Sequence, residues 1–232
     1  MSEATAQFIA KYVKTNPESL LCFPSGDSPT GTLEKLVQAA QRGDIDFSRC
    51  WFVGLDEWVG MDKHDHGSCQ QYIYMHLFDK LKLPAERIRF FDAKASDLNA
   101  ECEKVDRYIF DDGPLDIIVV GVGLNGHIGL NEPGSSFTSY SHVVDLAEST
   151  KTSGQKYFSQ ETKLEKGITI GIQHMMEAKT VVVIASGEKK ADIIQKIAEG
   201  EITENIPGSI LQKHPNCHLF LDRAAASRLS RT

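Results

Sequence analysis

The sequence has 232 residues, of which 41% are hydrophobic and 25% charged, as expected for a globular protein with a sizeable core. A net charge of −7 without any basic run disfavours nucleic acid as a partner. The sequence shows neither an apolar run of membrane-spanning length nor a signal-peptide core, so we expect no membrane partner. Its five scattered cysteines lack C-x-x-C spacing, which argues against a disulfide framework or a zinc knuckle and leads us to expect a reducing, cytoplasmic location.

Apolar runs that alternate with helical patterns predict a mostly parallel, doubly wound α/β sheet with helices on both faces, modified Rossmann-like, in a single domain over residues 1–232. In chain order, strands are expected at residues 19–23, 50–55, 87–91, 115–120, 142–146, 180–185 and 217–221. Helices are expected at residues 3–15, 29–43, 69–78, 97–110, 191–200 and 206–213. Functional side chains in such a fold lie on the loops that follow the strands.

The loop after the first strand reads PSGDSPTGT (residues 24–32) and leads into a helix. Ser28 is positioned to cap that helix, and Pro29 suits its first turn. A small-residue loop between a strand and a helix directs free N–H groups and the positive end of the helix dipole outward, which makes an anion site. A phosphate cradle and a simple tight turn fit this loop equally well.

Asp56 and Glu57 directly follow the second strand. Two carboxylates beside aromatic and apolar neighbours could include one base with a raised pKa, although a turn-capping role fits equally well. Because neighbouring side chains leave a strand on opposite faces, we expect only one of the two to face a substrate. His64 and His66 lie in the next polar loop without a further ligand cluster, so we expect solvated histidines and no metal site.

The buried strand at 115–120 leads into the glycine-rich loop GVGLNGHIGLNEPG. His127 and Glu132 on this loop could form a proton-handling pair, or could merely tie the loop down. The G-x-G-x-x-G spacing at 121–126, with Asp145 downstream, also fits the dinucleotide-binding fingerprint. That fingerprint requires a helix at its third glycine, whereas turn-forming residues follow here, so we do not expect a dinucleotide.

The strand at 180–185 is followed by the loop SGEKK and then by a helix. The arrangement repeats that of the first loop, now with lysines available for a phosphate. Lys189 and Lys190 could equally be solvated cations at the start of a helix.

In chain order, the motifs PSGDSPTGT, LDEWVG, GVGLNGHIGLNEPGSSF, KGITIGI and SGEKKAD resemble the glucosamine-6-phosphate deaminase/isomerase family. The resemblance extends over residues 18–222, and its NGHIGLNEPG block is highly specific. It implies an enzyme that opens the ring of an amino-sugar 6-phosphate, moves a proton from C2 to C1 and releases ammonia and a ketose phosphate. The resemblance also implies that no redox cofactor or catalytic metal is needed.

The resemblance assigns a role to each candidate residue. Asp56 would take the C2 proton and return it at C1. His127 would open the pyranose ring, with Glu132 orienting or tuning the imidazole. The residues that would hold the phosphate group are Ser25, Gly26, Asp27, Ser28, Lys156 and Lys190.

Three features depart from the family's usual pattern. Asn125, beside the catalytic histidine, stands where many glucosamine-6-phosphate deaminases have aspartate, and looks more like the galactosamine-6-phosphate isomerase branch. Lys156 stands where many members have an arginine, and gives a point charge in place of a bidentate fork. The first expected element is a helix, whereas members of the family usually begin with a strand. Both the gluco and the galacto substrate fit the sequence.

Two other functions are compatible with the same resemblance. A hydrolase like the 6-phosphogluconolactonases would share the fold, but those enzymes lack the Asn-Glu-Pro continuation found at 131–133. A non-catalytic sugar-phosphate sensor would carry a helix-turn-helix segment before the first strand, and only about eighteen residues are available there. We expect an amino-sugar phosphate as the small-molecule partner, and a monomer or small homo-oligomer.

Overall fold

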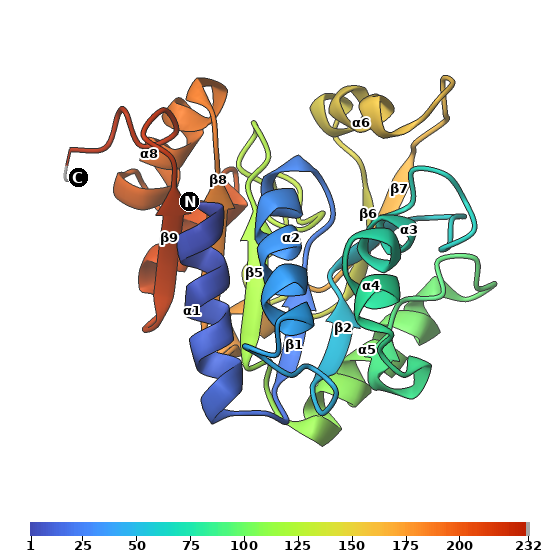
Figure 1. Ribbon diagram of the computed structural model, residues 1–232. Coiled ribbons are helices and arrows are strands. Elements are labelled where there is room, and N and C mark those ends of the chain that lie inside the picture. Colours follow the sequence, from blue (N-terminus) through green and yellow to red (C-terminus); the bar gives the residue numbers. More distant parts are fainter. Residues whose placement is uncertain (231–232) are drawn as a thin grey trace.

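The computed structural model describes residues 1–230, in which a six-stranded sheet lies between two layers of helices (Figure 1). Its strands, all parallel to their neighbours, are arranged in the order β4-β2-β1-β5-β8-β9. They span Leu20–Phe23 (β1), Trp51–Gly54 (β2), Ile88–Arg89 (β4), Ile117–Gly121 (β5), Val181–Ala185 (β8) and Cys217–Leu221 (β9). The expected doubly wound parallel sheet is therefore confirmed.

The helices are α1 (Ser2–Thr15), α2 (Asp27–Gln41), α3 (Cys69–Ile73), α4 (Asp79–Leu81), α5 (Leu98–Asp112), α6 (Glu148–Gly154), α7 (Ile172–Glu177) and α8 (Ala191–Glu199). A π-helical turn, Tyr74–Phe78, joins α3 to α4, and 3₁₀ turns cover Ala85–Arg87, Gln155–Tyr157, Glu188–Lys190 and Pro207–Lys213. Within residues 1–230, no helix combines the length and the apolar character needed to cross a membrane.

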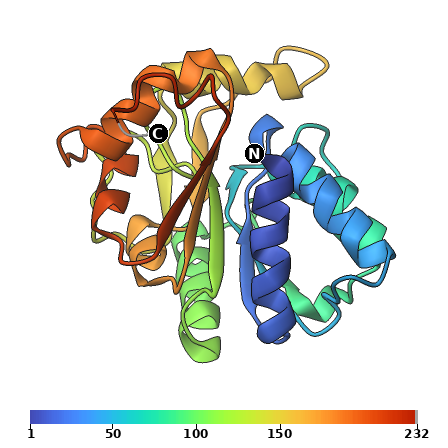
Figure 2. The same ribbon diagram turned by 60° about the vertical axis from the view of Figure 1, so that its left-hand side comes forward.

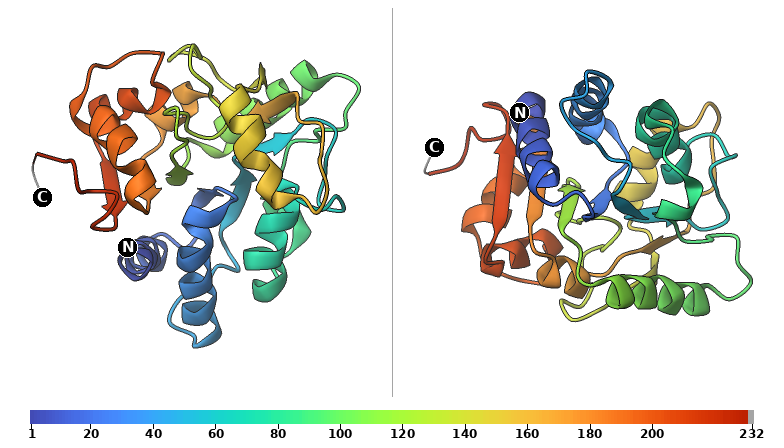
Figure 3. Two further views of the ribbon diagram at one scale, coloured as in Figure 1. Left: turned by 90° about the horizontal axis from the view of Figure 1, so that it is seen from above. Right: turned by 60° about the horizontal axis from the view of Figure 1, so that its bottom comes forward.

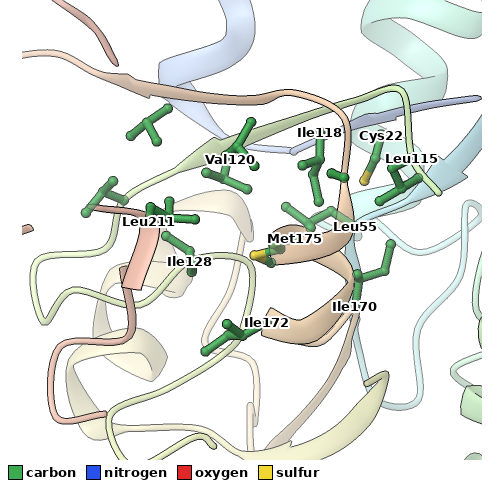
Figure 4. Packing of buried hydrophobic residues seen from close by; sticks show 14 of the residues in the cluster. Cys22, Leu55, Leu115, Ile118, Val120, Ile128, Ile170, Ile172, Met175 and Leu211 are labelled. Atoms are coloured by element: carbon green, nitrogen blue, oxygen red, sulfur yellow. The ribbon is translucent and has the colours of Figure 1, made fainter. Parts of the chain in front are cut away.

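Alternating burial along the strands explains why helices cover both faces of the sheet. In β5, Ile117 and Val119 belong to a core cluster shared with α1 and α2, whereas Ile118 and Val120 pack with residues of α5, α7 and α8. Figure 2 shows α1 and α2 on one side of the sheet and α8 on the other. Figure 4 shows Ile118 and Val120 on the same side of β5 as Met175 of α7. Both faces of the strand are therefore buried, as its continuous apolar run predicts.

A second, three-stranded antiparallel sheet begins where β2 ends. It consists of β3 (Asp56–Trp58), β7 (Lys166–Thr169) and β6 (His142–Asp145), in the order β3-β7-β6. The expected strand at 50–55 leaves the first sheet at Gly54, and the chain enters the second sheet at Asp56. The second sheet therefore fixes the backbone of Asp56 and Glu57 directly beyond the carboxyl end of β2.

The beginning of α2 differs from the expectation. The helix starts at Asp27, and its N-cap residue is Gly26, whose φ of 102° lies in the left-handed region. Ser28 lies inside the first turn, so its expected capping role is wrong, because the glycine turns the chain into the helix before Ser28 is reached. The expected strand at 87–91 is reduced to β4, and the expected helix at 206–213 is a 3₁₀ turn.

The strand order creates a crevice between β1 and β5. These two strands are neighbours, but the chain proceeds from β1 towards β2 and β4, and from β5 towards β8 and β9. Such a reversal leaves an opening beyond the carboxyl ends of the two strands, where ligands bind in open α/β sheets. The loop that follows β1 and the glycine-rich loop that follows β5 border this opening.

Candidate active site

The loop after β1 brings backbone N–H groups to the crevice. The N-cap residue of helix α2 is Gly26, which has no side chain to accept hydrogen bonds from the first N–H groups of the helix. The Tyr157 hydroxyl contacts the backbone N–H of Asp27. A Cβ atom added to Gly26 would lie 2.9 Å from that hydroxyl, so the site requires glycine for space as well as for its positive φ.

Two lysines converge on the beginning of α2. Nζ of Lys156 lies 2.5 Å from Oδ2 of Asp27, and Nζ of Lys190 donates to the carbonyl oxygen of Val122 at 2.5 Å. Burial lowers the pKa of Lys190, and the positive charge of Lys156 lowers it further while Asp27 opposes both effects. The two ammonium groups are therefore close enough to repel each other, an arrangement that a multivalent anion would relieve.

Asp56 and Glu57 are both buried, but they have different surroundings. Glu57 has no exposed surface and accepts hydrogen bonds from N–H of Trp58 (2.9 Å), Cys69 (2.9 Å) and Gln70 (2.8 Å) and from the hydroxyl of Ser68 (3.0 Å). Its oxygens are fully used to hold the start of α3. The contacts therefore leave Asp56 as the carboxylate available for chemistry.

Asp56 is 9% exposed, and its pKa is raised to about 7. Burial is the main cause, the charge of Glu57 adds to it, and a hydrogen bond from the Cys69 thiol opposes it. A carboxyl group with a pKa near neutrality can both accept and return a proton under physiological conditions. Its role as the base stays a prediction.

His127 lies flat against the glycine-rich loop, where a Cβ atom at Gly123 would lie 2.3 Å from its ring. Its Nδ1 is 3.5 Å from Oε2 of Glu132 and 3.2 Å from Oγ1 of Thr150. Burial raises the pKa of Glu132, but hydrogen bonds that involve His127, Thr150 and Asn125 outweigh burial and leave that pKa below its ordinary value. Glu132 is therefore an ionised partner for the imidazole.

Asn125 holds the same group of side chains together. Its Nδ2 donates to Oε2 of Glu132 at 2.8 Å and to Oγ of Ser149 at 3.3 Å, and its Oδ1 accepts from the N–H of His127 at 3.2 Å. The Asn125 amide thus donates to the carboxylate of Glu132 and accepts from the backbone of the loop. These contacts orient the neighbouring carboxylate and the loop that carries His127.

Several residues that contact the candidate site were not singled out in the sequence. Thr150 touches His127, the Cys69 thiol contacts Asp56, and Tyr157 closes over the first loop. Buried Asn131 fastens the glycine-rich loop by donating to the carbonyl oxygens of Ile128 and Ile170, both at 2.9 Å. Only Asn131 lies in a motif that could have revealed it, since the others belong to segments without a sequence signal.

Two alternatives from the sequence find no support. No helix occurs between β5 and β6, so the third glycine of the G-x-G-x-x-G spacing does not open one, as a dinucleotide site would require. His64 is exposed, while His66 helps to line a pocket of about 100 Å³ beside Ser25 and Cys69. Among residues 1–230, no three His, Cys, Asp or Glu side chains are grouped so that they could hold a metal ion.

Comparisons with known proteins agree with the motifs. The profile of the family "Glucosamine-6-phosphate isomerases/6-phosphogluconolactonase" matches residues 1–219. The glucosamine-6-phosphate deaminase of Shouchella clausii is 38% identical over 228 residues, covering 98% of this chain and 92% of that protein. The glucosamine-6-phosphate deaminase of Lysinibacillus sphaericus is 40% identical over 217 residues, covering 93% of this chain and 92% of that protein.

Solved structures separate the close relatives from the distant ones. A monomeric glucosamine-6-phosphate deaminase superimposes with a TM-score of 0.94 at 34% identity, covering 98% of this chain and 95% of that one. The 6-phosphogluconolactonase of Trypanosoma brucei gives a TM-score of 0.74 at 17% identity, over 99% and 96% of the two chains, and shows the fold alone. With its family profile matched over residues 1–219, the chain belongs to the glucosamine-6-phosphate isomerase/6-phosphogluconolactonase family.

Proposed function

We propose that this protein converts glucosamine 6-phosphate into fructose 6-phosphate and ammonia. The observation that carries the proposal is the buried Asp56 carboxyl, with its pKa of about 7, at the sheet edge that also presents the His127–Glu132 pair. Several relatives that are 34–40% identical over most of this chain are named glucosamine-6-phosphate deaminase.

Asp56 supplies the base that an aldose–ketose isomerisation requires. The reaction removes a proton from C2 and places one on C1, so a single carboxylate above both carbons can serve as base and then as acid. The low exposure of Asp56 keeps water away from that proton, and the bonds that occupy Glu57 keep the neighbouring carboxylate from competing for it. Return of the proton to C1 leaves an imine at C2, and a water molecule adds to that carbon as ammonia leaves, which gives the ketone of the ketose phosphate.

His127 opens the pyranose ring before that proton transfer. Ring opening breaks the C1–O5 bond, protonates the ring oxygen and removes the proton of the C1 hydroxyl as the aldehyde forms. An imidazole held by an ionised carboxylate is suited to both proton movements, because Glu132 stabilises the imidazolium that forms in passing.

The phosphate group is bound at the beginning of α2. Ser25, Gly26, Asp27 and Ser28 offer N–H and hydroxyl donors there, and Lys190 and Lys156 add positive charge. Asp27 contributes through its backbone, since its carboxylate is paired with Lys156 and must share that lysine when a phosphate enters. Binding of a remote phosphate positions C1 and C2 over Asp56.

The glucosamine epimer is favoured over the galactosamine epimer. The relatives named above carry the gluco substrate in their names. We further propose that the protein acts in the cytoplasm as a monomer or small homo-oligomer.

The test is to incubate the purified protein with glucosamine 6-phosphate, galactosamine 6-phosphate or 6-phosphogluconolactone, each in the presence of a chelator. Ammonia is measured by a coupled dehydrogenase assay, and the ketose phosphate by chromatography. We expect ammonia and fructose 6-phosphate from the first substrate at a rate that the chelator does not change. Lactone hydrolysis without ammonia release would overturn the proposal, and activity that depends on added zinc would overturn its metal-free mechanism.

A further inference from the structure

The first turn of α6 lies directly against the side chains of the glycine-rich loop. N–H of Ala147 donates to Oε1 of Glu132 at 3.3 Å, and Oγ1 of Thr150 lies 3.2 Å from Nδ1 of His127. Thr150 is only 4% exposed, although it belongs to a polar segment in which its neighbours face solvent. Its hydroxyl also forms a hydrogen bond with Glu132, so it bridges the carboxylate and the imidazole.

The number of available protons fixes the direction of these hydrogen bonds. An ionised carboxylate can only accept, and a threonine hydroxyl has one proton to donate. The proton of Thr150 therefore goes to Glu132, and the hydroxyl oxygen must accept from Nδ1 of His127. Nδ1 consequently carries a hydrogen, and in the neutral imidazole Nε2 is the unprotonated acceptor. Within residues 1–230, Nε2 has no protein hydrogen-bond partner of its own.

We propose that Thr150 is a positioning residue that selects the Nδ1–H tautomer of His127 and leaves Nε2 free to move the proton during ring opening; this inference rests on the proposed function. Nε2 accepts the proton of the C1 hydroxyl as the C1=O bond forms, and delivers it to the ring oxygen as the C1–O5 bond breaks. The imidazole ends in its initial protonation state. With the opposite tautomer, Nε2 would already carry a hydrogen and could not accept that proton.

The position of α6 explains why one hydroxyl can have this effect. The chain leaves Thr150, completes α6 and reaches Lys156, which pairs with Asp27 at the beginning of α2. Seen from above, α6 lies beside the beginning of α2 (Figure 3, left). The segment is thus held at both ends, at the imidazole and at the proposed phosphate site, which limits the freedom of the Thr150 hydroxyl.

The test compares Thr150→Val, which keeps the shape of the side chain but removes the hydroxyl, with Thr150→Ser, which keeps the hydroxyl. The matched control is Thr152→Val in the same helix, where the side chain is exposed. We expect Thr150→Val to lower kcat for glucosamine 6-phosphate about tenfold, as for the loss of one hydrogen bond. The KM and the affinity for an open-chain alditol 6-phosphate should stay within about twofold, because the alditol needs no ring opening. Thr150→Ser should restore most of kcat, and Thr152→Val should match the parent.

A second measurement does not depend on activity. Nitrogen-15 NMR of the histidine rings at pH 8 distinguishes the two neutral tautomers, and His127→Gln identifies the His127 signal. We expect the Nδ1–H tautomer in the parent and a mixture in Thr150→Val. An Nε2–H tautomer in the parent would overturn the inference, even if Thr150→Val failed to fold, and so would an unchanged kcat and tautomer in that variant. If the parent released no ammonia, the proposed function would fail while the tautomer measurement still decided the role of Thr150.

Discussion

Replacing Asp56 by asparagine should stabilise the protein while it abolishes the proton transfer. The pKa of Asp56 is raised from its ordinary value of 3.8 to about 7, mainly by burial and then by the charge of Glu57. Below pH 3.8 the carboxyl is neutral in both the folded and the unfolded chain. Between pH 3.8 and about 7 only the unfolded chain releases the proton, so the free energy of unfolding falls as the pH rises.

The size of this effect follows from the difference between the two pKa values. Each unit of difference between the folded and unfolded pKa values corresponds to about 1.4 kcal/mol. Above pH 7, the ionised Asp56 therefore lowers the free energy of unfolding by about 4 kcal/mol. Asparagine has nearly the same shape and no charge, so Asp56→Asn should be more stable than the parent by about 4 kcal/mol at pH 8. The gain should shrink to less than half of that value at pH 5, where most of the penalty has not yet developed.

Urea denaturation followed by circular dichroism at pH 5 and pH 8 measures both gains, and exchange of the C2 proton with solvent deuterium measures the chemistry. In the same variant, exchange of the C2 proton should cease and kcat should fall by about 10²- to 10⁴-fold, which is the usual contribution of a positioned general base to the rate. In the parent, kcat/KM should fall below pH 7 as the base becomes protonated. A stability gain that did not change with pH would refute the origin assigned to the raised pKa. Parent-like exchange in Asp56→Asn, with exchange lost in Glu57→Gln, would require the two roles to be swapped.

Two further substitutions test the surroundings of the site. Glu57→Gln should destabilise the protein by about 2 kcal/mol in urea denaturation, because its NH2 group must replace one of the two oxygens and then faces either the N–H of Cys69 or that of Gln70; a variant at least as stable as the parent would contradict this. Lys190→Ala should raise the KM for glucosamine 6-phosphate and the inhibition constant of inorganic phosphate by about tenfold or more, as for the loss of a charge-assisted contact. The control is the exposed neighbour: Lys189→Ala should leave both constants within about twofold of the parent. Equal effects of the two substitutions would show that Lys190 makes no specific contact with the phosphate.

The sequence by itself determined the features that arise from local pattern. The continuous apolar run of β5 predicts a strand buried on both faces, and the alternation of strands with helices predicts a parallel sheet whose loops meet at one edge. His127 and Glu132 lie on the same short loop, so their proximity follows from chain connectivity. The linear motifs around them were sufficient to predict the family.

Only the tertiary structure decided which groups complete the site. Nothing in the residues around 50–58 shows that the chain changes sheets at Asp56, because the run is equally suited to one strand or two. Thr150 reaches His127 across 23 residues, and Lys156 reaches Asp27 across 129. Such contacts depend on how loops close over the sheet, which no local pattern records. The raised pKa of Asp56 likewise exists only in the folded chain, because it arises from the exclusion of water by residues distant in sequence.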